Sequence, residues 1–253
     1  MTALTVMSYN IRYGGAGREN QLAEVIRACS PDVVLLQEAF RPPLVARLAG
    51  ECGYEHFGSR RGQSTGFLSR LDVEHQEWQK PRGARHAFLE LSFAGLDVHL
   101  VALHLSAWFS NWSERRRTYE IRALLHGIRD HQTGFHLIVG DFNALAPGER
   151  LELGRMPAWI RAMVWLSGND IARATIQTMY DAGYVDTWRR RNGDDPGFTF
   201  PTWDPHVRLD YAFAPERDAE RVTSCRVVTS PSAATKASDH FPLLLSLTGF
   251  DRD

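Results

Sequence analysis

The fold is decided by the stretch LTVMSYNIRYGGAGRENQLAEVIRACSPDVVLLQE, residues 4–38. Its two ends, 4–10 and 32–38, are predicted strands, and the second is apolar on both faces, as in a strand with packed layers above and below it. Between them, apolar residues recur at the spacing of one helix face: Leu22, Val25, Ile26 and Cys29. A strand, a helix and a second, buried strand favour parallel pairing of the strands under covering helices.

Strand-like runs occur in both halves of the rest of the chain. They lie at residues 54–59, 64–70, 86–93, 96–105, 135–143, 208–215, 221–230 and 241–247. The sequence FAGLD, residues 93–97, is a predicted hairpin turn, and a short helix is predicted at 44–49. Many strands in both halves, with helices between them, predict an α/β fold. We expect two sheets packed face to face with helices outside, in a single domain spanning residues 1–253.

Two further segments have the pattern of helices. In residues 113–130 the apolar face is formed by Ile121, Leu124, Leu125 and Ile128, so the arginines at 115–117 are predicted on the solvated face. Residues 144–183 are a predicted helical insertion rich in large apolar side chains: Met156, Trp159, Ile160, Met163, Val164, Trp165 and Leu166. A helix packed on the sheet is the favoured interpretation. An amphipathic helix that touches a membrane or a lipid substrate is the alternative.

The charge composition gives no global attraction to nucleic acid. The chain has 29 basic and 30 acidic residues, for a net charge of −1. This weakens a DNA-binding function without excluding it, because a local basic patch can suffice. The three cysteines, Cys29, Cys52 and Cys225, are too few and too widely spaced for a disulfide framework or a thiolate metal site.

Length and hydropathy indicate a globular protein. The 253 residues, 43% of them hydrophobic, are enough for a large core. No apolar run reaches the ~20 residues that a bilayer-spanning helix needs. The beginning of the sequence lacks the basic, apolar and cleavage regions of a secretory signal. We therefore expect a cytoplasmic protein without a transmembrane segment.

Polar residues end or interrupt several of the apolar runs. They are Asn10, Glu38, His104, Asp141, Asn143, Asp210, Asp239 and His240. A buried ionisable group must be paired, neutralised or bound to a metal, and eight such positions are too many to be isolated caps. Carboxylates and amides brought to one end of a sheet make a site for a hard cation such as Mg²⁺, and a nearby histidine can act as a general base.

The spacing of these residues adds geometric expectations. Asp141 and Asn143 are two apart, so in extended chain both would face one side and could hold a phosphate oxygen or a water molecule. Asp210 is flanked by Leu209 and Tyr211 in a predicted strand, so we expect it to point into a packed place. A carboxylate there can hold a histidine ring and set its tautomer. The pattern predicts a hydrolytic or transfer site with a divalent metal.

At these positions the chain resembles the endonuclease/exonuclease/phosphatase superfamily. The motifs are MSYNIR (7–12), LLQE (35–38), GDFNA (140–144), RLDY (208–211) and SDHFP (238–242), in the order found in that superfamily. The resemblance implies a four-layer α/β/β/α sandwich of two mixed β-sheets flanked by helices. It also implies hydrolysis of phosphate esters with Mg²⁺ or Mn²⁺, by in-line attack of water.

The resemblance implies a role for each matched residue. Asn10 and Glu38 would hold the metal, with Asp239 near it. Asp141 and Asn143 would orient the attacking water and the phosphate, and Asp210 would pair with His240. His240 would act as general base or stabilise the transition state; both assignments are open. His104 is similar to the second histidine of pancreatic-type deoxyribonucleases and sphingomyelin phosphodiesterases. By this resemblance, His104 would contact the phosphate or assist the leaving group.

The loops leave the substrate open. Trp108, Phe109 and Trp112 would line the mouth of the site, where they would stack on bases or contact an acyl chain, or they would cover the helix behind them. The loop GFTFPTWDPHVR, 197–208, which contains Trp203, is the main candidate for substrate selection, with rigid scaffolding as the alternative. The candidate phosphate contacts are Arg12, Arg60 and Arg61.

A phosphodiesterase is the favoured function. The alternative is a nuclease that acts on DNA or RNA. Apurinic-site endonucleases usually have a tyrosine in place of His104, so abasic-site cleavage is disfavoured. A non-catalytic binding module is a third hypothesis, and it is weakened because none of the catalytic positions is lost. We expect a monomer with no stable protein partner, which takes a small, lipid or nucleic-acid phosphate ester as substrate.

Overall fold

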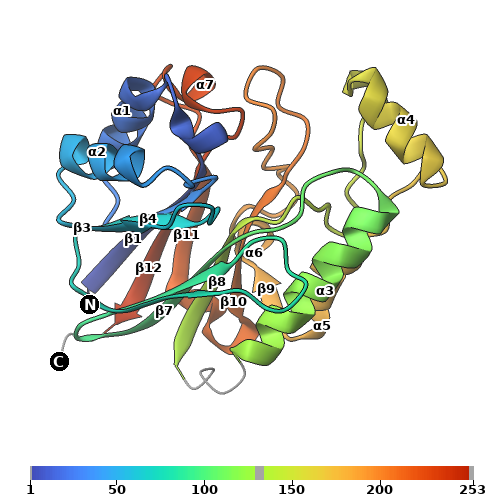
Figure 1. The fold of residues 1–253 in the computed structure, drawn as a ribbon. Coiled ribbons are helices and arrows are strands. Elements are labelled where there is room, and N and C mark those ends of the chain that lie inside the picture. The colour runs from blue at the N-terminus through green and yellow to red at the C-terminus, as the bar shows by residue number, and fades with distance from the viewer. Residues whose placement is uncertain (1, 129–133, 251–253) are drawn as a thin grey trace.

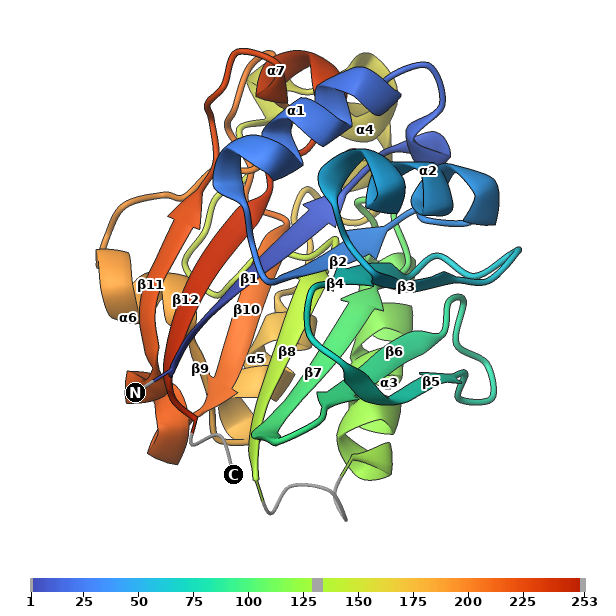
Figure 2. The same ribbon diagram turned by 90° about the vertical axis from the view of Figure 1, so that its left-hand side faces the viewer.

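The stretch that opens the sequence forms the expected parallel unit. β1 (Thr2–Asn10) and β2 (Val33–Gln37) pair in parallel, with Asn10 opposite Gln37 at their carboxyl ends. α1 (Glu19–Cys29) connects them and lies over one face of the sheet (Figure 2). The polar residues that end these two strands are therefore brought side by side.

The structure is a computed structural model that describes residues 2–128 and 134–250. Within these residues, two six-stranded sheets pack face to face (Figure 1). The first sheet has, in order of pairing, β11 (Val222–Val227), β12 (Leu243–Phe250), β1, β2, β4 (Gly66–Ser69) and β3 (His56–Ser59). The second has β5 (Val73–Gln79), β6 (Phe88–Phe93), β7 (Leu96–His104), β8 (Phe135–Asp141), β10 (Asp210–Pro215) and β9 (Tyr184–Asp186).

Both sheets are mixed, and each is built around one parallel pair. β1 and β2 are the parallel pair of the first sheet, and β7 and β8 are that of the second. The remaining neighbours pair antiparallel, including β6 and β7, which form the predicted hairpin with Phe93 opposite Leu96. Each half of the chain thus contributes a strand–helix–strand unit at the centre of a sheet.

Side-chain alternation along β2 divides the core into layers. Val33 and Leu35 point between the two sheets, where they join the main apolar cluster. Val34 and Leu36 point to the opposite face and pack under helices. Because successive residues of a strand face opposite sides, a strand that is apolar at every position must be covered on both. The prediction that 32–38 is buried on both faces is therefore confirmed.

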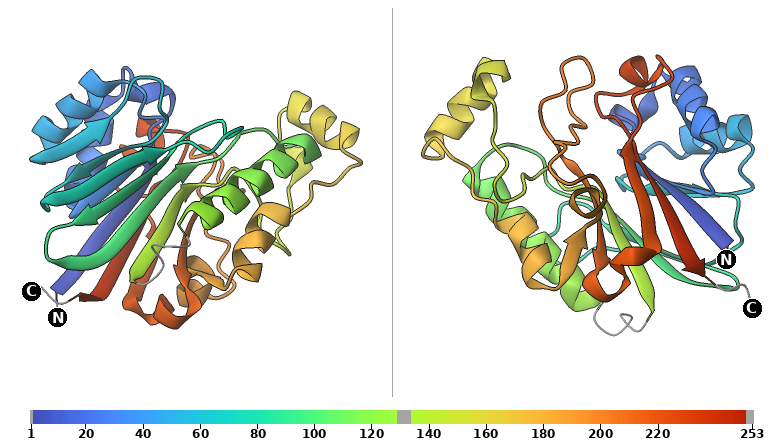
Figure 3. Two further views of the ribbon diagram at one scale, coloured as in Figure 1. Left: turned by 60° about the horizontal axis from the view of Figure 1, so that its bottom comes forward. Right: turned by 180° about the vertical axis from the view of Figure 1, so that it is seen from behind.

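Helices cover the outer face of each sheet. Over the first sheet lie α1, α2 (Pro42–Cys52) and α7 (Ala234–Ala237), and over the second lie α3 (Asn111–Gly127) and α5 (Ala174–Asp181) (Figure 3). The other helices are α4 (Ala158–Leu166), α6 (Thr187–Asn192) and the 3₁₀ helices η1 (Tyr13–Gly15), η3 (Leu153–Arg155) and η4 (Glu216–Arg221). The predicted α/β fold, a four-layer α/β/β/α sandwich, is confirmed.

Some elements were not expected from the sequence. β5 reads VEHQEWQ and is largely exposed at the edge of its sheet, so it lacks the apolar alternation that marks a strand. β9 has three residues and α7 has four, too few for a periodic pattern. The helix predicted at 44–49 is longer than expected and forms α2. The predicted end of the helix at 129–130 lies outside the described residues.

The helix α4 does not pack on a sheet, so the favoured interpretation of 144–183 is wrong for this helix, although α5 in the same segment does pack on the second sheet. Its inner residues, Ile160 and Val164, join a small apolar cluster whose other members lie outside the strands: Phe109, Leu145, Met156, Ile171, Val207 and Leu209. Figure 1 shows α4 at one corner of the molecule, away from both sheets. Irregular chain precedes and follows this helix, because residues 144–152 and 167–173 are neither helix nor strand. The description of 144–183 as an insertion, and of 1–253 as one domain, stays a prediction.

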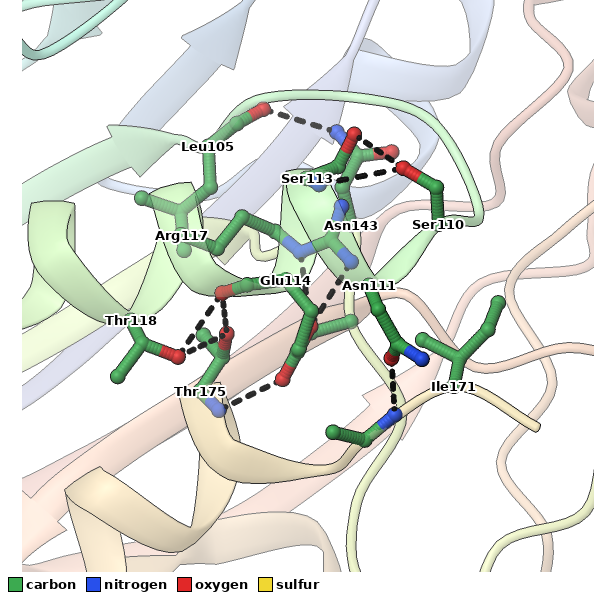
Figure 4. Close-up of polar contacts among 12 residues, drawn as sticks. Leu105, Ser110, Asn111, Ser113, Glu114, Arg117, Thr118, Asn143, Ile171 and Thr175 are labelled. Atoms are coloured by element: carbon green, nitrogen blue, oxygen red, sulfur yellow. Dashed lines mark hydrogen bonds and ion pairs between the residues drawn. The ribbon is translucent and has the colours of Figure 1, made fainter. Parts of the chain in front are cut away.

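One of the three arginines predicted on the solvated face of α3 is instead buried. Arg117 is 1% exposed, and its guanidinium pairs with the carboxylate of Glu114 at 2.8 Å (Figure 4). It also donates to the carbonyl oxygens of Ser106 and Trp108. Glu114 accepts a further hydrogen bond from the backbone of Thr175, at the start of α5. The prediction is wrong for Arg117 because the loop before α3 and the start of α5 cover that turn.

Among the described residues, no helix is both long enough and apolar enough to span a lipid bilayer.

We expect Arg117→Met to lower the free energy of unfolding by about 3–5 kcal/mol, because it leaves the buried Glu114 carboxylate without its cation. Urea denaturation measures the loss. The control is Arg115→Met on the exposed side of the same helix, which should change stability by no more than about 0.5 kcal/mol. Equal, small losses for both variants would contradict the buried ion pair.

Candidate active site

Strand register places three predicted site residues in a row across the second sheet. His104, the last residue of β7, lies opposite Asp141, the last residue of β8. On its other side Asp141 lies opposite Asp210, the first residue of β10. β7 and β8 are parallel and β10 runs antiparallel to β8, so two strand ends and one strand start meet at one edge. All three residues are buried.

A hydrogen bond joins this row to the first sheet. The side-chain amide of Asn10, at the end of β1, donates to Oδ2 of Asp141 at 2.9 Å. Both side chains are 1% exposed, so the bond is shielded from solvent. The carbonyl oxygen of Asn10 accepts from Oγ of Ser238, which brings the SDH motif to the same place. Residues far apart in the sequence are thus held together at the end of both sheets.

Steric crowding explains why the GDFN motif begins with glycine. Gly140 has a φ of 149°, and a Cβ built there would lie 2.0 Å from the carbonyl oxygen of Leu103 on β7. No other residue fits so close to the neighbouring backbone. This close approach lets β8 stay paired with β7 as far as Asp141, so the carboxylate of this candidate residue is positioned by the backbone of both strands.

The expectation that Asp141 and Asn143 face one side of an extended chain is wrong. β8 ends at Asp141, and Asn143 has a φ of 49°, in the left-handed region. Its backbone N–H donates to Oδ1 of Asp141, and its side-chain amide donates to the carbonyl oxygen of Leu105 (Figure 4). Strand alternation therefore does not apply beyond Asp141, and a turn is what brings Asn143 to the cleft described below.

His240 and Asp210 form a buried pair. Nδ1 of His240 lies 2.8 Å from Oδ2 of Asp210, and Nε2 lies 3.9 Å from Oδ2 of Asp141. Burial by itself would lower the pKa of His240, but the carboxylates of Asp210 and Asp141 outweigh burial and raise it. Burial raises the pKa of Asp141, and the positive charge of His240 opposes that rise. The arrangement therefore favours a protonated imidazole held in place by Asp210.

His104 has the opposite electrostatic environment. Burial lowers the pKa of His104, and the neighbouring His86 and His240 lower it further. Its Nδ1 shares a hydrogen bond with Oγ of Ser64, and its Nε2 lies 3.6 Å from Oδ2 of Asp141. His86 stacks on the ring of His104, with centroids 4.9 Å apart, and burial lowers the pKa of His86 to about 4. His104 is accordingly a neutral imidazole.

Sequence reasoning missed Ser64 and His86. Ser64 also accepts a hydrogen bond from the backbone N–H of Glu38, so it links Glu38 to His104. Both residues stand at the first position of a predicted strand, at 64–70 and 86–93. The only signal was a polar residue at the edge of an apolar run. That signal is common, and nothing in the sequence shows which strand edges meet.

Each of the three predicted metal ligands already has a hydrogen-bond or ion-pair partner. Oε2 of Glu38 accepts from the backbone N–H of Tyr13 at 2.5 Å, and Oδ1 of Asn10 accepts from the backbone N–H of Arg12. Asp239 pairs with the guanidinium of Arg12 at 3.2 Å. Within residues 2–128 and 134–250, one acid–histidine group has ligand atoms within 4.8 Å of one another: Asp141, Asp210 and His240. The structure thus offers two sets of donors for a divalent cation.

A cleft of about 970 Å³ opens above these residues. Its floor holds Glu38, His104, Asn143 and His240. Aromatic and apolar side chains form much of its wall: Phe40, Trp108, Phe109, Trp159, Ile160, Phe200 and Leu209. Three exposed arginines also line the cleft: Arg41, Arg61 and Arg85. A cleft of this kind has room and polar groups for a phosphate, and an apolar wall beside it.

The predicted substrate-binding residues do not all line the same cleft. Trp108 lines the cleft and is 50% exposed, whereas Trp112 is 78% exposed and does not line it. Trp203 and Arg12 line an adjoining groove, which shares Trp159 with the cleft.

Of the other residues in these loops, Phe109 lines the cleft wall and also packs in the cluster beneath α4. Arg61 lines the cleft, but Arg60 lies over the ring of Trp78 at 4.4 Å. The arginine contacts predicted from the sequence are therefore divided between the cleft and its surroundings.

We expect Gly140→Ala to lower the free energy of unfolding by more than about 2 kcal/mol and to reduce activity, because the added methyl group collides with β7. Gly50→Ala is the control, since that helical glycine has open space around it and alanine there should stabilise by about 0.5–1 kcal/mol. Urea denaturation and an activity assay measure both effects. A Gly140→Ala protein with unchanged stability would disprove the close approach.

Solved structures with the same fold include several phosphoesterases. An AP endonuclease from Archaeoglobus fulgidus aligns with a TM-score of 0.73 and 18% identity, over 97% of this chain and 100% of that one. The 3′ phosphatase NExo from Neisseria, bound to a product DNA hairpin, aligns with a TM-score of 0.72 and 17% identity, over 97% and 100%. An endonuclease/exonuclease/phosphatase from Beutenbergia cavernae aligns at 0.68 and 22%, over 98% and 72%. These likenesses show the fold.

No curated protein matches the sequence. The model of the endonuclease/exonuclease/phosphatase family matches residues 7–240, which include all the motifs from MSYNIR to the histidine of SDHFP. This match bears out both the resemblance and the prediction of an enzyme that hydrolyses phosphate esters. The chain belongs to the endonuclease/exonuclease/phosphatase family.

Proposed function

We propose that this enzyme is a divalent-metal-dependent phosphodiesterase, which cleaves by in-line attack of water on a phosphate held at the floor of the cleft. The observation that carries the proposal is the buried pair of His240 and Asp210, with Asp141 and His104 beside it. Two histidines of unlike charge and a carboxylate of raised pKa meet where a phosphate can enter. This is the donor and acceptor set that phosphate hydrolysis requires.

In this mechanism Asp141 takes the proton of the attacking water. Burial raises the pKa of Asp141, so its carboxylate can accept a proton near neutral pH. The proton leaves as the new P–O bond forms, and the bond to the leaving oxygen breaks on the opposite side of the phosphorus. The hydrogen bond from Asn10 fixes the orientation of Asp141 while the proton moves.

His240 acts as the electrostatic stabiliser. Its raised pKa keeps it protonated, so it offers a cation and an N–H at Nε2 to the oxygens of the phosphate in the transition state. Asp210 holds the ring at Nδ1. The neutral His104 offers a second ring nitrogen, and the side chain of Asn143 lies at the same cleft floor. The sequence left open whether His240 is the general base. In this mechanism the general base is Asp141.

The donors fit a hard cation. Mg²⁺ and Mn²⁺ prefer oxygen ligands, which Glu38, Asn10 and Asp239 supply. The alternative group is less suitable, because its third member, His240, is held protonated by Asp210 and Asp141, and a protonated imidazole is not a metal ligand. When bound, the cation supplies a Lewis acid that neutralises phosphate charge and stabilises the leaving oxygen. The residues of the chain bind and orient the substrate and take the proton.

The proposal also includes the location, the oligomeric state and the substrate class of the enzyme. We place the enzyme in the cytoplasm as a monomer, acting on a small or lipid phosphodiester. A nuclease is the second candidate, favoured by the arginines of the cleft and by the wall tryptophans, which can stack on bases. The DNA-bound solved structure with this fold is consistent with that candidate.

The first test is a hydrolysis panel with magnesium or manganese. It compares an aryl phosphodiester, a phosphomonoester, single- and double-stranded DNA, abasic duplex, RNA and sphingomyelin. We expect cleavage of the small or lipid diesters, and a loss of about 10²–10⁴-fold in kcat for His240→Ala, because the charge at the phosphate is gone. His75→Ala, at an exposed site on β5, is the control. Near-normal turnover by His240→Ala would remove it from the mechanism, and cleavage of nucleic acid alone would make the protein a nuclease.

The two donor sets make different predictions for metal titration of activity. We expect Glu38→Gln to raise the half-saturating metal concentration at least about tenfold, or about 1.4 kcal/mol, because it removes a charged ligand. Asp210→Asn should lower kcat and leave the metal midpoint in place, since it acts on His240. Glu51→Gln, at a partly exposed carboxylate of α2 that pairs with Arg47, is the control. A shifted midpoint in Asp210→Asn and not in Glu38→Gln would assign the metal to the alternative group.

A further inference from the structure

Exposed tryptophans gather around the mouth of the cleft and over α4. The surface consists of Trp108, Trp112, Trp159, Trp165, Leu166 and Trp203, and is called the tryptophan surface below. Each of these side chains is at least half exposed, and Leu166 and Trp112 reach 76% and 78%. Buried tryptophan is ordinary in a core, but several exposed side chains of this size in one region mark a site of interaction.

Contacts show that the surface is continuous. The rings of Trp108 and Trp159 meet edge to face, with centroids 5.5 Å apart. Trp159 and Trp203 line the same groove next to the cleft. At the other end of α4, Asn111 donates to the carbonyl oxygen of Ser167, which joins the start of α3, where Trp112 stands, to the end of α4.

The helix α4 is apolar on its exposed side as well as its buried side. Ile160 and Val164 face the cluster beneath it, while Trp159, Trp165 and Leu166 face outward. Arg161 is its one charged residue. A helix that is apolar all round is normally enclosed, yet α4 stands at a corner of the molecule on irregular segments (Figure 1). Among residues 2–128 and 134–250, its outer face therefore has no apolar cover.

The chemistry of the surface favours a lipid interface over nucleic acid. Nucleic-acid binding depends mainly on basic residues along the phosphate track, and the outer face of α4 offers only Arg161. Trp165 and Leu166 also lie beyond the cleft, where a scissile phosphate cannot be reached. Tryptophan is the residue that prefers the boundary between headgroups and acyl chains.

The charges near the surface fit the headgroup layer. Arg41, Arg61 and Arg85 at the cleft have no acidic partner among residues 2–128 and 134–250, and the same holds for Arg161 on α4. Free guanidinium groups beside exposed tryptophans complement a phosphate-bearing, amphiphilic surface. A protein partner or a second copy seated here would cover Trp108 and Trp159, and with them the entry to the site.

We propose that the tryptophan surface docks the protein onto an anionic phospholipid membrane, with α4 lying in the headgroup region and the cleft facing the lipid. The docking proposal rests only on the composition and exposure of the tryptophan surface and does not depend on the proposed function. One consequence rests on the proposed function: the substrate is a phosphodiester at the headgroup of an amphiphile, which enters the cleft without leaving the interface.

The test uses the purified chain and vesicles of phosphatidylcholine with phosphatidylglycerol, with binding measured by co-sedimentation. We expect the wild-type protein to sediment with these vesicles. The double substitution Trp165→Ala with Leu166→Ala should weaken binding at least about tenfold, because it removes the most exposed apolar groups of α4. Phe57→Ala, an exposed aromatic on β3, is the matched control and should bind like wild type.

Hydrolysis of a soluble aryl phosphodiester separates docking from chemistry. Trp165 and Leu166 do not line the cleft, so the double variant should hydrolyse this substrate at the wild-type rate. The docking proposal is overturned if the wild type does not bind vesicles, or if the double variant binds as well as wild type. It is also overturned if the variant instead abolishes a dimer in solution, or loses affinity for single-stranded DNA but not for vesicles. Vesicle binding without any hydrolysis would leave docking intact and count against the proposed function.

Discussion

The hydrogen bond from Asn10 to Asp141 is the constraint on which the site depends. It joins the end of β1 in one sheet to the end of β8 in the other, and it is buried. Each sheet alone would expose a row of polar residues. Packed face to face, the two sheets bring an amide and a carboxylate to one point, and the SDH segment closes over it through Ser238. The sandwich is therefore the support of the site as well as a means of burying apolar surface.

The surroundings of the two histidines in the site determine their different protonation states. His104 lies beside a second imidazole and a hydroxyl, and burial keeps it neutral. His240 lies between two carboxylates, which outweigh the same burial and keep it charged. In the proposed mechanism, a neutral imidazole and a fixed cation at one phosphate bind substrate and stabilise charge without a change of protonation in either ring. In the proposed mechanism Asp141, whose pKa burial raises, is then the group that moves a proton.

Much of the fold follows from the sequence, because apolar periodicity reports burial. The doubly apolar run at 32–38 predicted a covered strand, and the motifs predicted the layers. What failed depends on tertiary contacts. Arg117 has the periodicity of a solvated residue but is covered by another loop, and Asn143 leaves the strand that alternation assumed. The stacking of His86 on His104 joins two strand edges that no local pattern relates.

The most direct test of the metal-dependent site is anomalous diffraction from crystals soaked in Mn²⁺. The account predicts a peak bound by the carboxylate of Glu38, next to Asn10, with Asp210 still bonded to His240. Such a peak would leave the protonated imidazole and the proton acceptor free for the reaction. A peak among Asp141, Asp210 and His240, with Glu38 unbound, or no peak at millimolar metal, would contradict the assignment of these roles.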